Sequence, residues 1–288
     1  MTKLSNTVVG LLDGTVVNAD SPLIHPDDYG LLRGDGVFET TLAVDGVPRD
    51  LAEHLARLEV SAAMLDLVLP ALTHWHRAID AVLAQSAAGQ LVLRLVATRG
   101  REGGDAPTCF VLAAAPSPRL HVERSAGISV LLLDRGFVGD EVAAMPWLLA
   151  GAKTLSYAMN MAARRYAEKH GADDVIFVGR DGRILEGPTA TVVVARDGLL
   201  ITPPVDGILA GVTVRRLFRA AAAAGWETET APLTPADLDA ADGLWLVSGV
   251  RLLAPVTAVD GRPRPIGPAT AELAEILQVP GLIETGRG

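Results

Sequence analysis

Apolar and polar residues follow two different spacings along this chain. Short apolar runs separated by Asp-Gly pairs, which favour tight hairpin turns, predict strands. Longer stretches with apolar side chains every three or four positions predict helices. The expected strands lie at 7–11, 15–17, 37–43, 46–49, 91–98, 108–114, 128–133, 174–179, 183–185, 190–195 and 243–248. The expected helices lie at 51–67, 71–87, 154–170 and 211–224.

This order of elements predicts an α+β fold with two domains, each built on a mixed, mainly antiparallel sheet. A segment with two prolines, several polar residues and little periodicity separates the two groups of elements, as is typical of a linker. We therefore expect an N-terminal α/β domain at 1–114, an interdomain linker at 115–126 and a C-terminal domain at 127–288.

The composition is that of a globular protein and narrows the possible partners. Of 288 residues, 49% are hydrophobic and 20% are charged, and the net charge is -9 with no basic run. Nucleic acid is not an expected partner, because binding a phosphate backbone needs a concentrated positive surface. No membrane partner is expected either, because no apolar stretch reaches the roughly 20 residues of a spanning helix. The N-terminal residues also lack the apolar core of a signal peptide.

The chain has a single cysteine, Cys109, and therefore cannot form an intrachain disulfide. This fits a cytoplasmic location, where thiols stay reduced. Cys109 begins the apolar run 109–113, which favours a buried strand residue over a catalytic thiol.

Lys153 is the first candidate for chemistry. It lies between a Pro-Trp loop and a predicted amphipathic helix, and the small residues Gly151 and Ala152 leave room for a ligand near its amine. The apolar residues around it would disfavour the charged form of the amine, as a nucleophilic lysine requires. Taken alone, however, the position favours an ordinary surface lysine at the start of a helix.

Four separated segments change that interpretation, because together they resemble the fold-type IV pyridoxal-phosphate enzymes. This group contains the branched-chain aminotransferases, the D-amino-acid aminotransferases and the aminodeoxychorismate lyases. The segments occur in the family's order and at similar spacing. They are RGDGVFET (33–40) with EHLARLEVSA (53–62), AKTLSYAMNMAARRYA (152–167), DDVIFVGRDGRILEGPTATV (173–192) and GILAGVTVRRLF (207–218). The resemblance runs over nearly the whole chain, as far as LVSGVRLLAPV (246–256).

The resemblance implies a two-domain fold similar to that of D-amino-acid aminotransferase, with pyridoxal 5'-phosphate bound between the domains. Lys153 matches the lysine that forms a Schiff base with the cofactor, and Arg57 matches the arginine that binds its phosphate. Glu186 matches the carboxylate that pairs with the pyridine nitrogen, which makes the ring an electron sink. Tyr157 resembles a tyrosine whose hydroxyl approaches the ring oxygen.

The family pattern also implies a second set of phosphate contacts. Leu209 would pack on the cofactor ring, and the Val212 and Thr213 amides would bind phosphate at a helix N-terminus, where free N–H groups favour anions. Ser248 and Gly249 match a second phosphate-contacting turn. The chain departs from many aminotransferases here, since they have a threonine where this chain has Gly249.

Several details favour the lyase branch, and the chain is most similar to actinobacterial aminodeoxychorismate lyases. Branched-chain enzymes usually have a tyrosine in place of Arg33, and an acidic residue before the proline of the last motif. The resemblance then implies elimination of pyruvate from 4-amino-4-deoxychorismate to give 4-aminobenzoate for folate synthesis. Arg33, Arg94 and Arg99 are candidates to bind the two carboxylates of this anionic substrate, although at least one should be an ordinary strand-edge arginine. Thr40 or Thr41 could assist a proton transfer.

Three alternatives stay open from the sequence. A pyridoxal-phosphate aminotransferase acting on D-amino or branched-chain amino acids with 2-oxoglutarate would use the same cofactor residues. A non-enzymatic α+β scaffold would make Lys153 incidental. A metal hydrolase is disfavoured, because His74 and His76 do not share a helix face and no metal-ligand motif is present. The resemblance also implies a homodimer.

Overall fold

The computed structural model describes residues 7–86 and 89–282, and these residues form two compact units. Unit 1 contains the chain up to Ser117 together with Ala152–Tyr157, and unit 2 contains Pro118–Gly151 and the chain from Ala158 onward. Residue 87 of one predicted helix and the N-terminal residues 1–6 lie outside the described residues. The chain therefore returns to unit 1 for one short segment, which a division into consecutive ranges does not capture.

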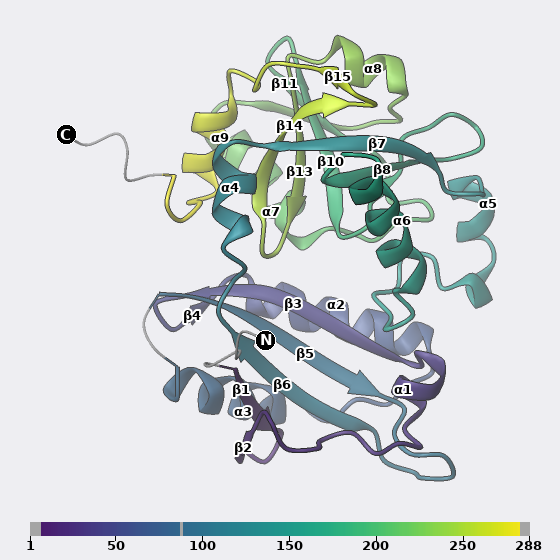
Figure 1. Cartoon of the computed structure of the whole chain (residues 1–288), viewed down its shortest axis with the longest axis vertical. Helices are drawn as coiled ribbons and strands as arrows, with labels where there is room; N and C mark the ends of the chain where they lie inside the picture. The colour runs from purple at the N-terminus through teal and green to yellow at the C-terminus, as the bar shows by residue number, and fades with distance from the viewer. Residues whose placement is uncertain (1–6, 87–88, 283–288) are drawn as a thin grey trace. The chain divides into compact units, whose positions relative to one another are not determined.

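Unit 1 is built on an antiparallel sheet with the strand order β2-β1-β6-β5-β3-β4 among the described residues (Figure 1). Its strands are β1 (Val8–Leu11), β2 (Val16–Asn18), β3 (Gly36–Val44), β4 (Val47–Pro48), β5 (Gln90–Thr98) and β6 (Thr108–Ala114). Its helices are α1 (Tyr29–Arg33), α2 (Leu51–Met64) and α3 (Leu72–Ala84).

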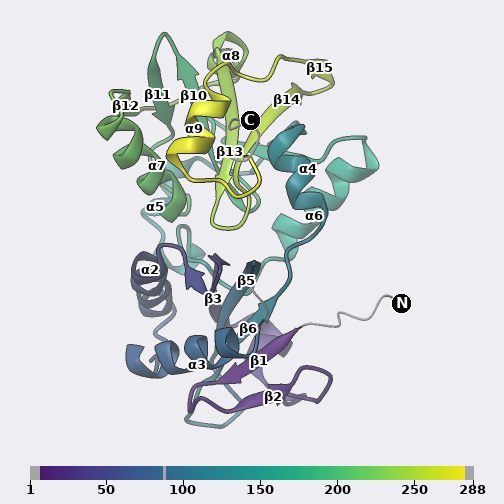
Figure 2. The ribbon, with the colours of Figure 1, turned by 90° about the vertical axis from the view of Figure 1, so that its left-hand side faces the viewer.

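Helices α2 and α3 cover one face of the unit 1 sheet, as Figure 2 shows. Alternate residues of β3, including Val37 and Ala43, point to that face, as the two-residue period of a strand requires. They pack with Leu58 of α2 and Trp75 of α3 in one buried cluster. The opposite face carries Phe38, Thr40 and Leu42 by the same alternation.

Unit 2 is built on a mixed sheet with the order β12-β11-β10-β13-β14-β7-β8 among its described residues, to which β9 and β15 add at β10 and β14. The pairs β11/β12, β14/β7 and β7/β8 are parallel. The strands are β7 (Ile128–Asp134), β8 (Asp174–Val178), β9 (Glu186–Gly187), β10 (Ala190–Arg196), β11 (Leu199–Thr202), β12 (Glu227–Thr230), β13 (Gly243–Ser248), β14 (Leu252–Val259) and β15 (Arg262–Pro263).

Several helices surround this sheet. They are α4 (Arg119–Ser125), α5 (Gly139–Ala143), the short 3-10 helix η1 (Pro146–Leu148), α6 (Ala158–Lys169), α7 (Val212–Ala223), α8 (Pro235–Ala240) and α9 (Thr270–Ile276). Helix α7 contacts β13, α9 contacts β14, and both helices contact each other. In the part of the chain that the structure describes, no helix has the length and apolar content to span a bilayer.

The α+β class and the two-domain architecture are confirmed, whereas several element boundaries are wrong. The helix expected at 154–170 begins only at Ala158, because residues 153–155 bond along β3 instead. The strand expected at 183–185 is an isolated bridge at Ile184, followed by the two-residue β9. The helix expected at 51–67 ends at Met64.

The expected linker 115–126 contains the helix α4. Two of its buried residues, Glu123 and Arg124, are charged, so the helix has no apolar periodicity from which it could be predicted. The three-part division at 1–114, 115–126 and 127–288 stays a prediction.

The packing of α2 against the sheet can be tested with a substitution on each of its faces. We expect Leu58→Ala, which truncates a fully buried side chain, to lower the free energy of unfolding by about 2–5 kcal/mol through lost burial and a cavity. The control is Val60→Ala on the same helix, whose side chain is 59% exposed and whose change should stay within about 0.5 kcal/mol. Urea unfolding measures both, and equal losses would contradict this packing.

Candidate active site

Lys153 lies on an extended segment that runs beside β3 within unit 1. The Phe38 amide donates a hydrogen bond to the Lys153 carbonyl at 3.1 Å, and the Leu155 amide donates to Gly36 at 2.8 Å. Thr154 forms a bridge with Val37. These backbone bonds fix the position of Lys153, which is therefore not a surface lysine at a helix start. The residue is only 8% exposed.

Aromatic side chains surround the amine of Lys153. Its Nζ lies 4.4 Å from the centroid of the Phe38 ring and 5.3 Å from that of the Tyr157 ring. The two rings meet edge to face at 5.1 Å. Nζ also donates to the Tyr157 hydroxyl at 3.4 Å. The amine is thus held among aromatic surfaces beside one hydroxyl, an environment suited to a lysine nucleophile.

Helix α2 connects Lys153 to Arg57, the predicted phosphate-binding residue. The Lys153 amide donates to the hydroxyl of the buried Ser61 at 3.0 Å. Ser61 lies four positions after Arg57, so both residues lie on one face of the helix. This face therefore positions two of the predicted cofactor residues within unit 1.

A buried carboxylate orients Arg57. Glu39 on β3 accepts hydrogen bonds from Arg57 Nε at 2.7 Å and from Arg57 Nη2 at 2.9 Å. It also contacts His54 Nδ1 at 2.6 Å and accepts from the Thr40 amide at 3.3 Å. Burial opposes ionisation of Glu39, but the hydrogen bonds from His54 and Arg57 outweigh it and lower its pKa to about 2. Glu39 is therefore anionic at neutral pH and holds the guanidinium of Arg57 in one orientation.

Thr191 in unit 2 lies beside Glu186, which is predicted at the cofactor ring, and beside the start of α7. Thr191 of β10 pairs with Glu186 on one side and with Val247 of β13 on the other. A methyl group at Gly211 would come within 2.5 Å of the Thr191 hydroxyl, so the start of α7 approaches the same point. The Leu209 amide donates to the Glu186 carboxylate at 3.2 Å.

The N-terminus of α7 has the features of an anion site predicted from the sequence. Gly211 is the N-cap and has no side chain to cap the helix, and α7 begins with the buried residues Val212 and Thr213. The first amides of a helix have no acceptor within it, and the helix dipole favours negative charge there. Ser248 ends β13, and Gly249 follows in the turn to β14. Both are half-buried.

The three predicted substrate arginines have different environments in unit 1. Arg94 is exposed on β5 and pairs in register with Thr40 of β3, on the sheet face opposite α2. Arg33 is exposed at the end of α1. Arg99 instead bonds the Asp35 carboxylate, with Nε at 2.6 Å and Nη2 at 3.1 Å. Its Nη2 also donates to the Leu65 carbonyl at 2.6 Å, so Arg99 ties the start of β3 to the end of α2.

The two candidate threonines, Thr40 and Thr41, lie on opposite faces of the unit 1 sheet. Thr41 is buried, and its hydroxyl donates to the Arg49 carbonyl at 2.7 Å, so its hydrogen bond stabilises the local backbone. Thr40 lies on the other sheet face, where Phe38 contacts the Lys153 amine. Of the two, only Thr40 shares a face with the candidate nucleophile.

Sequence reasoning missed the buried network of Glu39, His54 and Ser61. One signal was available: Glu39 is the one charged residue of β3 and occupies an inward position, where a charge requires a partner. His54 and Arg57 lie three positions apart on the next helix, which is the spacing of one helix face. Their joint contact with Glu39 depends on how α2 packs across β3.

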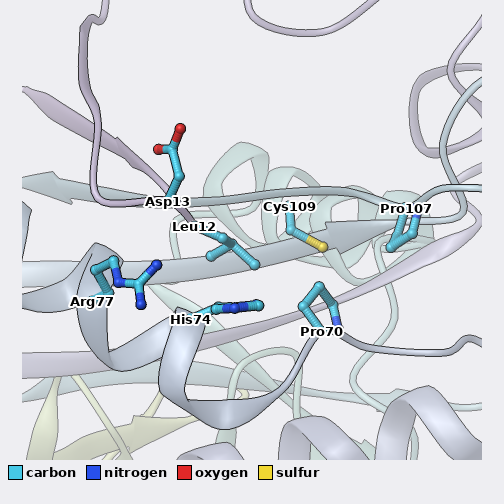
Figure 3. Close-up of a pocket in the computed structure, with 7 residues that line it drawn as sticks. All are labelled: Leu12, Asp13, Pro70, His74, Arg77, Pro107 and Cys109. Atoms are coloured by element: carbon cyan, nitrogen blue, oxygen red, sulfur yellow. The ribbon is translucent and has the colours of Figure 1, made fainter.

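A pocket of about 360 Å³ lies elsewhere on unit 1. Figure 3 shows the Cys109 sulfur and the His74 ring turned toward it, and its other lining residues are Leu12, Asp13, Pro70, Arg77 and Pro107. Burial, with a smaller contribution from the charge of Asp28, raises the pKa of the Cys109 thiol to about 12. A thiol that stays protonated is a poor nucleophile. Among the described residues no group of three or more His, Cys, Asp or Glu side chains is arranged to hold a metal.

The chain belongs to the class IV aminotransferases, as the fold and these residues suggest. The sequence model of this family, described as amino-transferase class IV, matches residues 36–259. Members of the family are enzymes that use pyridoxal phosphate.

Three relatives show how similar the chain is to characterised members. It is 45% identical over 281 residues, 94% of this chain and 97% of the relative, to the bifunctional aminodeoxychorismate lyase / D-amino acid transaminase of Mycobacterium tuberculosis. A structure of a hypothetical aminotransferase from M. tuberculosis in its PLP-bound form is 45% identical and covers 95% and 98% of the two chains, with a TM-score of 0.92. A fold IV transaminase from Curtobacterium pusillum is 41% identical over 94% and 99%, with a TM-score of 0.89.

The buried Glu39 network makes a pH-dependent contribution to stability that can be measured. We expect Glu39→Gln to destabilise the protein by about 3–5 kcal/mol at pH 7, because it replaces the buried carboxylate that pairs with Arg57 by a neutral amide. A lowered carboxyl pKa stabilises the fold above the unfolded value, near 4.5, and this contribution is lost as the pH falls toward about 2. The difference between wild type and variant should therefore be constant above pH 4.5 and shrink below it.

Denaturant unfolding at several pH values measures this difference. The control is Glu59→Gln, an exposed carboxylate on α2, which should leave the stability nearly unchanged at every pH. A Glu39→Gln variant as stable as wild type at pH 7 would contradict a stabilising role for the buried Glu39 carboxylate.

Proposed function

We propose that this chain attaches pyridoxal phosphate covalently to Lys153 and acts as a 4-amino-4-deoxychorismate lyase. The observation that carries the proposal is the buried Lys153 amine beside Phe38 and Tyr157. It occurs in a chain that is 45% identical, over nearly its whole length, to a relative named for this lyase reaction.

The residues of both units fit each polar group of the cofactor. In unit 1, Lys153 would attach the cofactor, Tyr157 would donate to its ring oxygen and Arg57 would bind its phosphate. In unit 2, Glu186 would pair with the ring nitrogen and Leu209 would pack on the ring. The remaining phosphate contacts would come from Val212, Thr213, Ser248 and Gly249. The donor chemistry of each unit supports this fit. Unit 1 supplies the Arg57 guanidinium for a phosphate, and unit 2 supplies the amides at the start of α7 for a phosphate and the Glu186 carboxylate for a ring nitrogen.

Bound pyridoxal phosphate supplies a conjugated ring that accepts the electron pair released when a carbon bearing an amine loses its proton. The chain supplies the proton transfer. The Nζ of Lys153 would be the general base that removes this proton. Tyr157, whose hydroxyl lies 3.4 Å from Nζ, orients the amine. Glu186, fixed by the Leu209 amide, keeps the ring nitrogen protonated.

The lyase reaction requires one further bond to break. Loss of the C4 proton of the substrate is followed by cleavage of the bond between C3 and the ether oxygen. The released enolate takes up a proton at carbon to become pyruvate, and the ring becomes the aromatic 4-aminobenzoate. Thr40, on the sheet face that carries Phe38, is the candidate to assist this proton transfer.

A second activity is favoured by the same relative, whose name also includes D-amino acid transaminase. A transaminase would use Lys153 to return the proton to the cofactor rather than release pyruvate. Its substrates would be D-amino or branched-chain amino acids with 2-oxoglutarate. The relative solved with alpha-ketoglutarate and PMP supports this alternative.

Arg94 and Arg33 are the proposed contacts for the substrate carboxylates. Arg94 shares a sheet face with Phe38, whose ring contacts the Lys153 amine, and its guanidinium is exposed. Arg99 is a weaker candidate, because the Asp35 carboxylate and the Leu65 carbonyl occupy its donors. We further propose that the enzyme works as a cytoplasmic homodimer and supplies 4-aminobenzoate for folate synthesis.

Covalent attachment at Lys153 can be tested directly. We expect the purified protein, supplied with pyridoxal phosphate, to show the visible absorption of a lysine-bound cofactor. Borohydride should abolish this band and leave the cofactor on the peptide that contains Lys153 after digestion. Lys153→Ala should lose the band, whereas Lys169→Ala, at the exposed end of α6, should keep it. Reduction at another lysine, or no band in wild type, would refute the proposal.

The reaction itself is decided by paired assays. With aminodeoxychorismate we expect equal amounts of 4-aminobenzoate and pyruvate, and with D-alanine and 2-oxoglutarate a slower transamination. Arg94→Met should raise the KM for aminodeoxychorismate by about tenfold or more, since one carboxylate loses a charged partner. The KM for D-alanine should change less. Turnover of the amino acids alone would overturn the lyase assignment but keep the cofactor assignment.

A further inference from the structure

The turn between β13 and β14 is unusually constrained. Ser248 pairs with Leu252, so Gly249, Val250 and Arg251 make the whole connection. Leu252 has a φ of +63°, a left-handed conformation that a leucine seldom adopts. Such a conformation persists where the surroundings enforce it. The contacts of this turn therefore need an explanation beyond the closing of a hairpin.

Arg124 of helix α4 holds the turn from its buried side. Its Nε donates to the Arg251 carbonyl at 3.0 Å and its Nη2 to the Val250 carbonyl at 2.7 Å. Its Nη1 donates to the Pro280 carbonyl at 3.3 Å. The side chain is 2% exposed. One buried cation thus binds two of the three carbonyls of the turn.

The side chain of Arg251 anchors the same turn a second time. Its Nε donates to Glu123 of α4 at 2.9 Å, and its Nη1 donates to Asp174 of β8 at 2.8 Å. All three side chains are buried. Because two elements bind the turn residue at fixed positions, the turn has little freedom to move relative to the sheet.

We propose that Arg124 is a positioning residue for the phosphate of the cofactor, acting through the turn Gly249–Arg251. This inference rests on the proposed function, which assigns Ser248 and Gly249 to the phosphate. In a planar trans peptide unit the N–H points away from the C=O. Arg124 holds the Val250 and Arg251 carbonyls, so the N–H groups of Arg251 and Leu252 in the same peptide units point away from it. Because the far end of the turn is fixed in this way, Ser248 and Gly249 at its start keep a fixed position, as donors to a bound anion require.

The competing explanation is that Arg124 only stabilises unit 2. Arg264 provides a matched control, because it also binds two backbone carbonyls in this unit. It donates to Leu238 at 2.7 Å and to Ala241 at 2.9 Å, at the end of α8 rather than at the turn. Loss of either arginine should weaken the fold, but only loss of Arg124 should change recognition of a phosphate.

The test compares two ligands that differ only in the phosphate group, pyridoxal phosphate and pyridoxal. The full-length apoproteins of wild type, Arg124→Met, Arg124→Lys and Arg264→Met are titrated with each ligand, followed by visible absorbance. Thermal unfolding is measured without ligand. We expect Arg124→Met to raise the Kd for pyridoxal phosphate at least about tenfold and the Kd for pyridoxal by no more than about twofold.

Arg124→Lys should give an intermediate Kd for pyridoxal phosphate, because lysine keeps the charge but lacks the fork that binds two carbonyls. If Arg124→Met does not fold, the Kd values of Arg124→Lys for pyridoxal phosphate and pyridoxal provide the same comparison. Arg264→Met should lower the melting temperature and leave both Kd values near those of wild type. An equal rise for the two ligands, or an equal effect of Arg264→Met, overturns the inference.

Failure of the inference can be told apart from failure of the proposed function. Wild type that binds pyridoxal phosphate at Lys153, with Arg124→Met unchanged, overturns the positioning role alone. Wild type that binds neither ligand overturns both proposals.

Discussion

The backbone pairing of residues 152–157 with β3 is the constraint on which the candidate site depends. Hydrogen bonds between Lys153 and Phe38 and between Leu155 and Gly36 fix this segment in unit 1, although the chain before and after it belongs to unit 2. Without this pairing Lys153 would move with the loops of unit 2. With it, Lys153 is held against β3, which carries Phe38, and against α2, which carries Arg57.

Each unit supports its share of the site with buried charges rather than with apolar packing alone. In unit 1 the carboxylate of Glu39 holds Arg57, and in unit 2 Arg124 and Arg251 hold the turn after Ser248. Buried ion pairs contribute little net stability, because desolvation offsets their attraction. They fix geometry well, however, since a charged hydrogen bond is directional and costly to break. Their contacts with residues that we propose to bind the phosphate suit a role in orientation.

The sequence predicted the parts of the molecule that depend on local patterns. Strands such as β10 contain a short apolar run, here Val192–Ala195, and helices such as α2 carry apolar residues at regular intervals. The roles proposed for Lys153 and Arg57 could be inferred only from the joint occurrence of separated motifs.

The remaining features depend on tertiary contacts that no local pattern contains. Residues 154–157 fit a helix by periodicity, but pairing with β3 overrides that preference. Helix α4 was missed because its buried face carries Glu123 and Arg124, whose partners include the distant turn Gly249–Arg251. The separate environments of Arg94 and Arg99 follow from strand register and from the position of Asp35. Nothing in their immediate sequence distinguishes these two arginines.

The return of the chain to unit 1 at residues 152–157 limits how this protein can be recombined. A fragment that ends at Ser117 would contain β3 and Arg57 but would lack both the lysine and the segment that pairs with β3. A chimera that joins the first unit of one relative to the second unit of another would therefore bring a foreign lysine segment against its β3. Compatibility at these six residues, rather than at the junction near Ser117, decides whether such a hybrid assembles a working centre. Unit 1 is one compact unit in space, but no single continuous stretch of the sequence encodes it.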